Sequence, residues 1–225
     1  MSKGLELRRV VIRQEGRVLV NIDRLIAPGE VLTIMGPSGS GKSTLLSFIT
    51  GTLAPAFTAE GAVLLDGVDL TARPPHERMI GILFQDDLLF PHMSVGGNLA
   101  FGLRPGGSRA ERDRKIKQAL ADVGLEGFAC RDPATLSGGQ RARVALMRML
   151  LSDPCALLLD EAFSRLDAAL RAQVRELVLT RAQERGLPVL MVTHDMADGL
   201  AAGGDIIDLG MSSPPCAAPA PPASV

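Results

Sequence analysis

Two glycine-rich segments, far apart in the chain, have the residue types of phosphate-binding sites. Residues 36–43 read GPSGSGKS, and residues 136–140 read LSGGQ. Glycines let the backbone close around phosphate oxygens, and a lysine can neutralise the charge of those oxygens. In the second segment Ser137 can cap a helix, and the N–H groups of Gly138 and Gly139 are then available to an anion at the positive end of the helix dipole. The chain therefore carries two candidate phosphate sites.

The first segment matches the pattern G-x-x-x-x-G-K-[ST] of a nucleotide-binding loop. In that pattern Lys42 neutralises the β- and γ-phosphate oxygens, and Ser43 offers a hydroxyl to Mg²⁺. A dinucleotide fingerprint is the alternative, because Gly39, Ser40 and Gly41 read G-x-G, but no third glycine follows at the required spacing. The loop therefore predicts a nucleotide with Mg²⁺.

Two carboxylates and a histidine follow apolar runs further along the chain. Residues 157–161 (LLLDE) predict a buried strand that ends in Asp160 and Glu161, and His194 follows the apolar run 189–192. A helix cap is the alternative for the carboxylates, and a structural role is the alternative for a lone histidine. Beside a nucleotide-binding loop, we expect Asp160 to hold Mg²⁺ through water, Glu161 to polarise the attacking water, and His194 to contact the γ-phosphate.

Alternating strand and helix patterns must position these residues. Residues 5–12 and 18–26 alternate like strands of a half-exposed antiparallel sheet. The later part of the chain alternates between buried strands and helices, so we expect a largely parallel, doubly wound α/β core. Buried strands are predicted at 29–35, 156–159 and 188–192, and helices at 42–49, 109–123, 137–151 and 167–184. Residues 62–65 and 80–84 are further short apolar runs.

Composition and charge limit the class of protein. The chain has 225 residues, 46% of them hydrophobic, and a formal net charge of -1. This composition suits a globular core, and the charge provides no overall field for nucleic acid or an anionic membrane. The charged residues of the predicted helix 109–123 are interpreted as a solvated face, with a nucleic-acid patch as the alternative. We expect no nucleic-acid partner.

Cysteine usage and hydropathy indicate the compartment. The three cysteines, Cys130, Cys155 and Cys216, are odd in number and lack metal-ligand spacing, which favours reduced thiols in the cytoplasm. No apolar run approaches the roughly 20 residues that cross a bilayer. The first residues, with Glu6 and Arg8 among them, lack the apolar core of a signal peptide. A role at a membrane would therefore require binding to another chain.

Together these segments resemble the nucleotide-binding subunit of an ABC transporter. The resemblance extends from about Leu5 to about Leu209. It rests, in chain order, on residues 36–44, Gln85, residues 136–140, 157–161 and 164–167 (SRLD), and His194. Residues 80–86, 132–146 and 163–167 further resemble the YnjD-type ATPases of bacterial import systems.

The resemblance implies a fold and an activity. It implies an ABC ATPase domain at 1–211, with a P-loop NTPase (RecA-like) core, an N-terminal antiparallel β-subdomain and an α-helical subdomain inserted at about 86–151. The Pro- and Ala-rich residues 212–225 predict a disordered tail. The implied activity is ATP hydrolysis that energises a membrane transporter, most simply an importer. A soluble ABC ATPase that acts without a permease is the alternative, and a module with inactive catalysis is disfavoured by the intact Lys42, Asp160, Glu161 and His194.

The resemblance also implies site residues and partners. The partners would be a second copy in a head-to-tail dimer, permease subunits held by the helical subdomain, and an extracytoplasmic solute-binding protein, with the chain at the cytoplasmic face of the inner membrane. Catalysis would use Lys42, Gln85, Glu161 and His194, and Mg²⁺ would be held by Ser43, Gln85 and Asp160. ATP would be held by Gly36, Pro37, Ser38, Gly39, Ser40, Gly41, Lys42, Ser43 and Thr44 of one copy and by Ser137, Gly138, Gly139 and Gln140 of the other.

Two positions depart from the family pattern. The family usually stacks adenine on an aromatic residue ahead of the phosphate loop, but this chain has no Tyr and no Trp, and its first Phe is Phe48. Gln14 or Arg13 occupies the expected region, and only an arginine plane can partly replace a ring. Ala162 stands where proline is usual, which is expected to loosen the turn after Glu161 without removing a chemical group.

Overall fold

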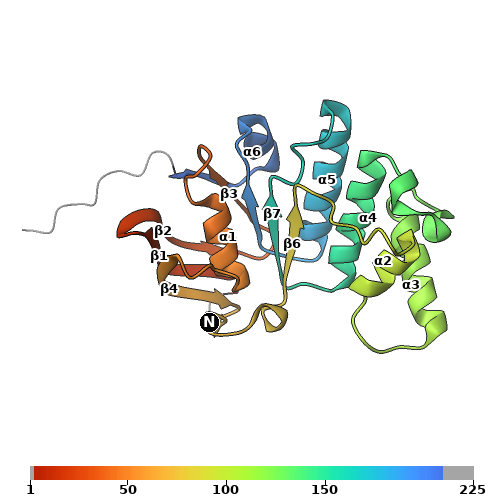
Figure 1. Ribbon diagram of the computed structural model, residues 1–225, viewed down its shortest axis with the longest axis horizontal. Helices are drawn as coiled ribbons and strands as arrows, with labels where there is room; N and C mark the ends of the chain where they lie inside the picture. The colour runs from red at the N-terminus through yellow and green to blue at the C-terminus, as the bar shows by residue number, and fades with distance from the viewer. Residues whose placement is uncertain (1–2, 210–225) are drawn as a thin grey trace, which may run out of the picture.

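The computed structural model describes residues 3–209, which form two β-sheets and a layer of helices (Figure 1). The predicted disordered tail at 212–225 and Cys216 lie outside the described residues. Within residues 3–209, no helix combines the length and the apolar character that a membrane span requires. Of the cysteines within the described residues, Cys130 and Cys155 are free and exposed.

The first sheet is antiparallel and is built mainly from the N-terminal part of the chain. β1 (Leu5–Gln14) lies between β2 (Arg17–Ile26) and β4 (Phe57–Leu65), and β5 (Val68–Asp69) pairs with β4. Buried and more exposed residues alternate along much of β1, which confirms the predicted half-exposed strand. The register of β1 shifts near Arg9, whose φ is 47°, so the strand carries a bulge there.

The second sheet is parallel and carries the strand ends at which the site was predicted. Its strand order is β6-β7-β8-β3-β9, and every neighbouring pair is parallel. This arrangement confirms the predicted α/β core next to an antiparallel subdomain. β9 was not predicted. The strands are β3 (Val31–Met35), β6 (Ile80–Phe84), β7 (Ala156–Asp160), β8 (Val189–Val192) and β9 (Asp205–Asp208).

The predicted helices are present, and two more accompany them. The predicted ones are α1 (Lys42–Thr50), α3 (Arg109–Ala121), α4 (Gly138–Leu151) and α5 (Ala168–Glu184). The additional ones are α2 (Val95–Gly102) and α6 (Met196–Ala202). The glycines Gly96 and Gly97 gave α2 a low helix propensity, and α6 is too short for a clear periodic pattern. Single 3₁₀ turns occur at Pro75–Glu77, Phe128–Cys130 and Pro133–Thr135.

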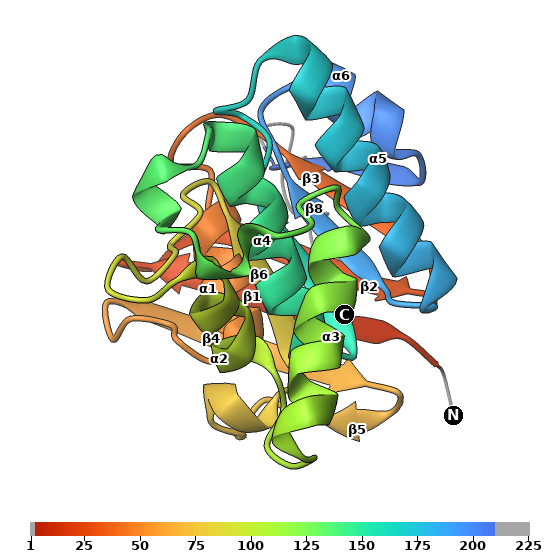
Figure 2. The ribbon, with the colours of Figure 1, turned by 90° about the vertical axis from the view of Figure 1, so that its right-hand side faces the viewer.

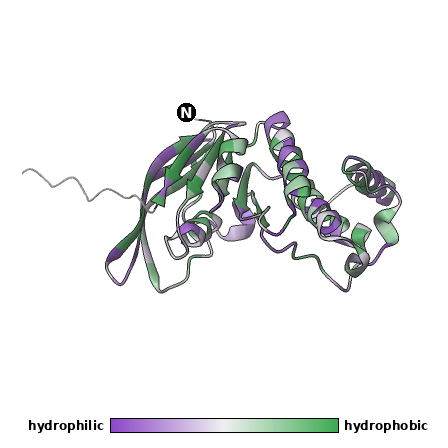
Figure 3. Ribbon diagram, turned by 90° about the horizontal axis from the view of Figure 1, so that it is seen from above, coloured by the Kyte–Doolittle hydropathy of each residue, from purple (hydrophilic) through white to green (hydrophobic). Residues whose placement is uncertain are grey.

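The helices α2, α3 and α4 form a layer of their own. All three lie between β6 and β7 in the sequence. They gather at the end of the molecule away from the antiparallel sheet (Figure 1), and the turned view places α3 in front of α4 (Figure 2). Seen from above, the strands are mostly hydrophobic in colour, whereas the helices carry alternating polar and apolar bands (Figure 3). Such bands are typical of helices that bury one face.

The parallel sheet separates two hydrophobic cores. Leu157 and Leu159 of β7 pack with the helices α2 to α5, whereas Ala156 and Leu158 pack with α1 and the antiparallel sheet. Successive side chains of a strand point to opposite faces, so one buried strand serves both cores. The carboxyl end of β7 is therefore fixed from both sides.

Candidate functional site

The nucleotide-binding loop joins β3 to α1. Gly36, Gly39 and Gly41 have φ values of 147°, 81° and 95°, a backbone region that side chains rarely adopt. A Cβ atom added to Gly41 would lie 2.8 Å from Val20 Cγ2, whereas one added to Gly39 would meet no atom within 4 Å. Gly41 thus permits close packing on β2, and Gly39 leaves the outer side of the loop open.

Lys42 folds back into this loop. Its ammonium group donates hydrogen bonds to the carbonyl oxygens of Gly36 (2.7 Å) and Pro37 (2.9 Å), and the residue is only 7% exposed. Gly41, at the start of α1, offers no side-chain cap to the first N–H groups of the helix. Among the described residues, the buried Ser40 Oγ has no hydrogen-bond partner. A concave loop with a buried cation, uncapped N–H groups and an unsatisfied hydroxyl fits phosphate.

Asp160 and Gln85 lie at the ends of neighbouring parallel strands. Asp160 ends β7 and pairs in register with Phe84, the last residue of β6, so Gln85 follows directly beside it. Burial raises the pKa of the Asp160 carboxyl, the charge of Glu161 raises it further, and Lys42 lowers it. The influence of Lys42 places the end of β7 within electrostatic reach of the phosphate loop.

Glu161 and His194 come together at the same edge of the sheet. Glu161 Oε1 lies 3.2 Å from His194 Nδ1, and the two side chains are 26% and 61% exposed. Glu161 has a φ of 48° and its backbone N–H donates to the Val192 carbonyl at 2.9 Å. A non-glycine residue in this region is strained and is found where the surroundings hold it. The sequence predicted a role for Glu161 and for His194, but it predicted neither the strained backbone of Glu161 nor the contact between the two side chains.

The predicted metal ligands suit Mg²⁺ bound together with a nucleotide. Within residues 3–209 there is no group of three or more His, Cys, Asp or Glu side chains placed to hold a metal ion. The predicted set of Ser43, Gln85 and Asp160 contains one carboxylate. Mg²⁺ is commonly bound by one or two carboxylates with substrate phosphates and waters, so this donor set fits such an ion.

The second glycine-rich segment begins α4. Ser137 Oγ accepts a hydrogen bond from the Gln140 N–H at 3.3 Å, and Gln140 Oε1 accepts one from the Ser137 N–H at 3.0 Å. This capping box confirms the predicted helix start. A Cβ on Gly139 would lie 2.2 Å from Leu170 Cδ2, whereas one on Gly138 would meet only Arg141, at 3.9 Å. A side chain at Gly139 would therefore displace Leu170, whereas Gly138 faces open space.

The two glycine-rich segments do not form one site within the chain. The loop at 36–43 lies beside β3 and leads into α1, whereas residues 136–140 begin α4 in the helical layer on the far side of β6 (Figure 1). The structure thus brings the phosphate loop, Asp160, Glu161 and His194 to one sheet edge. The LSGGQ segment lies away from this edge.

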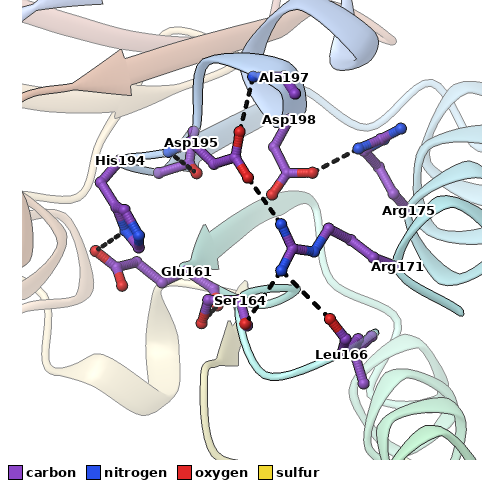
Figure 4. Close-up of polar contacts among 10 residues, drawn as sticks. Glu161, Ser164, Leu166, Arg171, Arg175, His194, Asp195, Ala197 and Asp198 are labelled. Atoms are coloured by element: carbon purple, nitrogen blue, oxygen red, sulfur yellow. Dashed lines mark hydrogen bonds and ion pairs between the residues drawn. The ribbon is translucent and has the colours of Figure 1, made fainter. Parts of the chain in front are cut away.

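Residues beyond the predicted set connect to Glu161 and His194. Ser164 Oγ donates to the Glu161 carbonyl at 2.8 Å, and the Asp195 side chain accepts from the Ala197 N–H at 2.8 Å to begin α6 (Figure 4). Arg171 on α5 contacts both segments (Figure 4). Sequence reasoning missed Arg171, because an arginine near a helix start carries no signal that separates it from a solvated charge.

A groove with exposed apolar side chains lies between β6, α2 and α4. It has a volume of about 480 Å³. At its rim Phe84, Leu88 and Phe101 are 41%, 56% and 65% exposed. Arg148 donates to the Leu88 carbonyl at 2.8 Å, and its guanidinium lies 5.2 Å from the centre of the Phe90 ring. Burial lowers the pKa of Arg148. Exposed apolar side chains gathered on a surface are typical of interaction sites.

A larger groove, of about 810 Å³, lies against α3 and the end of α4. It is lined by several arginines, of which Arg104, Arg112 and Arg185 donate hydrogen bonds to main-chain carbonyls. Arg112 donates to the carbonyls of Arg104 (2.8 Å) and Ala100 (2.9 Å), and Arg185 donates to the Leu150 carbonyl (3.0 Å). We assign these cations to holding the backbone, and the functional site to the edge of the parallel sheet.

Comparison with known proteins gives consistent matches along the chain. The family model described as ABC transporter matches residues 19–164. The uncharacterised ABC transporter ATP-binding protein YnjD of Escherichia coli (strain K12) is 47% identical over 199 residues, covering 88% of this chain and 91% of that protein. The thiamine import ATP-binding protein ThiQ of Jannaschia sp. (strain CCS1) is 46% identical, covering 86% and 83%.

A solved structure has the same fold. It is that of CbiO1 from Clostridium perfringens, described as part of the ABC transporter complex CbiONQ. It superposes with a TM-score of 0.81 at 27% sequence identity, covering 93% of this chain and 86% of the other.

Proposed function

The chain belongs to the ABC transporter family and is an ATP-hydrolysing subunit of a membrane transporter, and from this premise we propose that it powers import. Support for import comes from relatives whose names describe import of thiamine (ThiQ) and of taurine (TauB, Pseudomonas putida, 43% identical). The system would then include a solute-binding protein outside the membrane and the chain at the cytoplasmic face.

ATP is bound by the loop that joins β3 to α1. The N–H groups at the start of α1 would donate to the β- and γ-phosphates, and the Lys42 ammonium would turn from the Gly36 and Pro37 carbonyls toward the phosphates. Ser43, exposed in the first turn of α1, would hold Mg²⁺ together with Gln85 and Asp160. When bound, this ion supplies positive charge beside the phosphate oxygens.

Hydrolysis is assigned to Glu161 and His194. Their contact at 3.2 Å is the observation that carries the proposal, because it puts a proton acceptor and a phosphate-binding side chain at the sheet edge next to the phosphate loop. Glu161 would accept hydrogen bonds from the attacking water and polarise it. His194 would turn to donate to the γ-phosphate, and Lys42 would stabilise the transferred charge.

Each complete site would need a second copy of the chain. The LSGGQ segment lies on the far side of β6 from the phosphate loop of its own chain (Figure 1). In a head-to-tail dimer, the start of α4 from one copy would close over ATP held by the other copy. The open surface at Gly138 suits this role, because backbone N–H groups can approach a phosphate where no side chain intervenes.

The groove between β6, α2 and α4 is proposed to hold the permease. Its exposed Leu88 and Phe101 give an apolar anchor. Its lining includes residues 84 and 86, the chain neighbours of Gln85, so a bound membrane subunit would be linked to the γ-phosphate side of the site. This location is consistent with a chain that reaches the membrane through a partner.

Replacement of Phe101 by glutamate tests the permease proposal. The complex is purified from membranes through the tagged chain, and the partners are identified by mass spectrometry. We expect the wild type to retain multi-span membrane subunits and Phe101→Glu to lose them, since a charge would be buried in the apolar groove. Leu200→Glu is the matched control, because Leu200 is 69% exposed on α6 and lies outside the groove. Equal loss in both variants, or retention in both, would contradict this assignment.

A further inference from the structure

Arg171 joins the two chain segments that follow Glu161 and His194. It lies in the first turn of α5, and its side chain is 26% exposed. One guanidinium nitrogen donates to Asp195 Oδ2 at 2.7 Å, and the other terminal nitrogen donates to the carbonyls of Ser164 and Leu166, each at 3.3 Å (Figure 4). A planar guanidinium can serve a carboxylate and a loop at once, whereas a single ammonium is a point charge.

Both segments continue to the side chains assigned to hydrolysis. Ser164 Oγ donates to the Glu161 carbonyl at 2.8 Å, and the Asp195 N–H donates to Thr193 Oγ1 at 3.0 Å on the other side of His194. The Glu161–His194 contact then completes a closed ring through Arg171 (Figure 4). Displacement of either segment would therefore shift both the Glu161 and the His194 side chains.

A neighbouring ion pair provides the comparison. Arg175, one turn further along α5, donates to Asp198 on α6 (Figure 4). Asp198 is 3% exposed, so this pair already attaches α6 to α5. Among the described residues, the hydrogen bond of Arg175 leads to α6 alone, whereas Arg171 also reaches the loop after Glu161.

We propose that Arg171 is a positioning residue for hydrolysis, which fixes the loop after Glu161 and the segment after His194 at a set separation. The inference rests on the proposed roles of Glu161 and His194. Its physical basis is the φ of 48° at Glu161, a strained conformation that surrounding contacts must hold. The Arg171–Asp195 pair is charge-assisted and partly shielded from water, so it is a firm anchor for this arrangement.

Matched Arg-to-Lys replacements test the proposal in the assembled transporter. Arg171→Lys keeps a positive charge near Asp195 but loses simultaneous contact with the Ser164 and Leu166 carbonyls. We expect its kcat for ATP to fall by about tenfold or more, because a small misplacement of reacting groups costs up to about a hundredfold. Its KM and ATP affinity should stay within about twofold, since the phosphate loop is untouched. Arg175→Lys keeps its pair with Asp198 and should retain kcat. Equal kcat in the two variants overturns the proposal.

A second variant covers the case in which Arg171→Lys folds poorly. Asp195→Asn keeps an oxygen for the Ala197 N–H but removes the charge that faces Arg171. It should also lower kcat. The kcat of the Arg171→Lys/Asp195→Asn double variant should lie within about twofold of that of the slower single variant, because both changes break the same ring of contacts. Effects that multiply, or a normal kcat for Asp195→Asn, overturn the proposal. If Glu161→Gln itself hydrolyses ATP normally, the proposed function fails instead.

Discussion

Glu161 Oε1 and His194 Nδ1 lie 3.2 Å apart at the carboxyl edge of the parallel sheet. The register explains the contact, because Asp160 of β7 pairs with Val192 of β8, Glu161 follows Asp160 directly, and His194 follows Val192 by two residues. The Glu161 N–H donates to the Val192 carbonyl, which continues the pairing of β7 with β8 as far as Glu161. One phosphoryl group placed at this edge would face both side chains.

Arg78 is expected to stabilise the end of α1 that lies away from the nucleotide. It is 4% exposed and donates to the carbonyls of Phe48, Ile49, Thr71 and Arg73, at 2.7 to 2.9 Å. The Phe48 carbonyl also accepts from the Gly51 N–H, but Arg78→Met would remove the donor from the other three carbonyls, which costs at least about 2 kcal/mol in the free energy of unfolding.

Urea denaturation measures this cost. The control is Arg24→Met, at an exposed position of β2, where a change within about 0.5 kcal/mol is expected. Equal stability of the Arg78 and Arg24 variants would show that the four carbonyls are satisfied without the guanidinium.

Discrimination between ATP and GTP is expected to be weak. The chain has no Tyr or Trp, and the Arg13 guanidinium, the candidate replacement for a stacking ring, is engaged by Glu60 at 2.7 Å. Aromatic stacking contributes about 1–3 kcal/mol per base, and without it the phosphate and Mg²⁺ contacts dominate binding. Competition between the two nucleotides on the purified chain gives the preference, and a ratio above about a hundredfold would show that another group contacts the base.

A mixture of two inactive variants is expected to restore ATP-dependent dimers. Lys42→Ala removes the cation of the phosphate loop, and Gly138→Arg places a bulky charge at the start of α4. Gly138 is chosen over Gly139 because an added Cβ there meets no atom closer than 3.9 Å, so the fold is preserved. In the mixed dimer, the intact loop of one chain meets the intact LSGGQ segment of the other, and one complete site forms.

Light scattering with a non-hydrolysable ATP analogue measures dimer formation without depending on turnover. Each variant alone should remain monomeric, and the mixture should dimerise. A folded mixture that stays monomeric, or a single variant that dimerises like wild type, would contradict the shared site.

Much of this architecture was predictable from local patterns. The strands that end at Asp160 and Val192 were marked by apolar runs, because buried parallel strands have continuous hydrophobic sequences. The start of α4 was marked by Ser137, since a capping residue acts within one turn. The residues assigned to phosphate binding could also be predicted, because the nucleotide-binding loop has a fixed spacing of residues.

Other features depend on tertiary structure and left no local signal. Arg78 finds its carbonyl partners on α1, far away in sequence, so only the folded chain distinguishes it from a surface arginine. The role of Gly139 became visible with Leu170 of α5, which packs against it. The backbone strain of Glu161 likewise depends on β8, which holds its N–H group. The contacts of Arg171 with two chain segments likewise form only in the folded chain and left no local signal in the sequence.

The most direct test of the account is ATP hydrolysis by Glu161→Gln in the assembled transporter, with ATP binding measured on the same sample. The amide keeps the shape of the side chain but is a far weaker proton acceptor, so we expect hydrolysis to fall by about 10²- to 10⁴-fold. Binding should be preserved, because Lys42 and the phosphate loop are unchanged. Glu126→Gln, at an exposed position between α3 and α4, should hydrolyse ATP like wild type. Near-normal hydrolysis by Glu161→Gln would contradict the assignment of Glu161 to the attacking water.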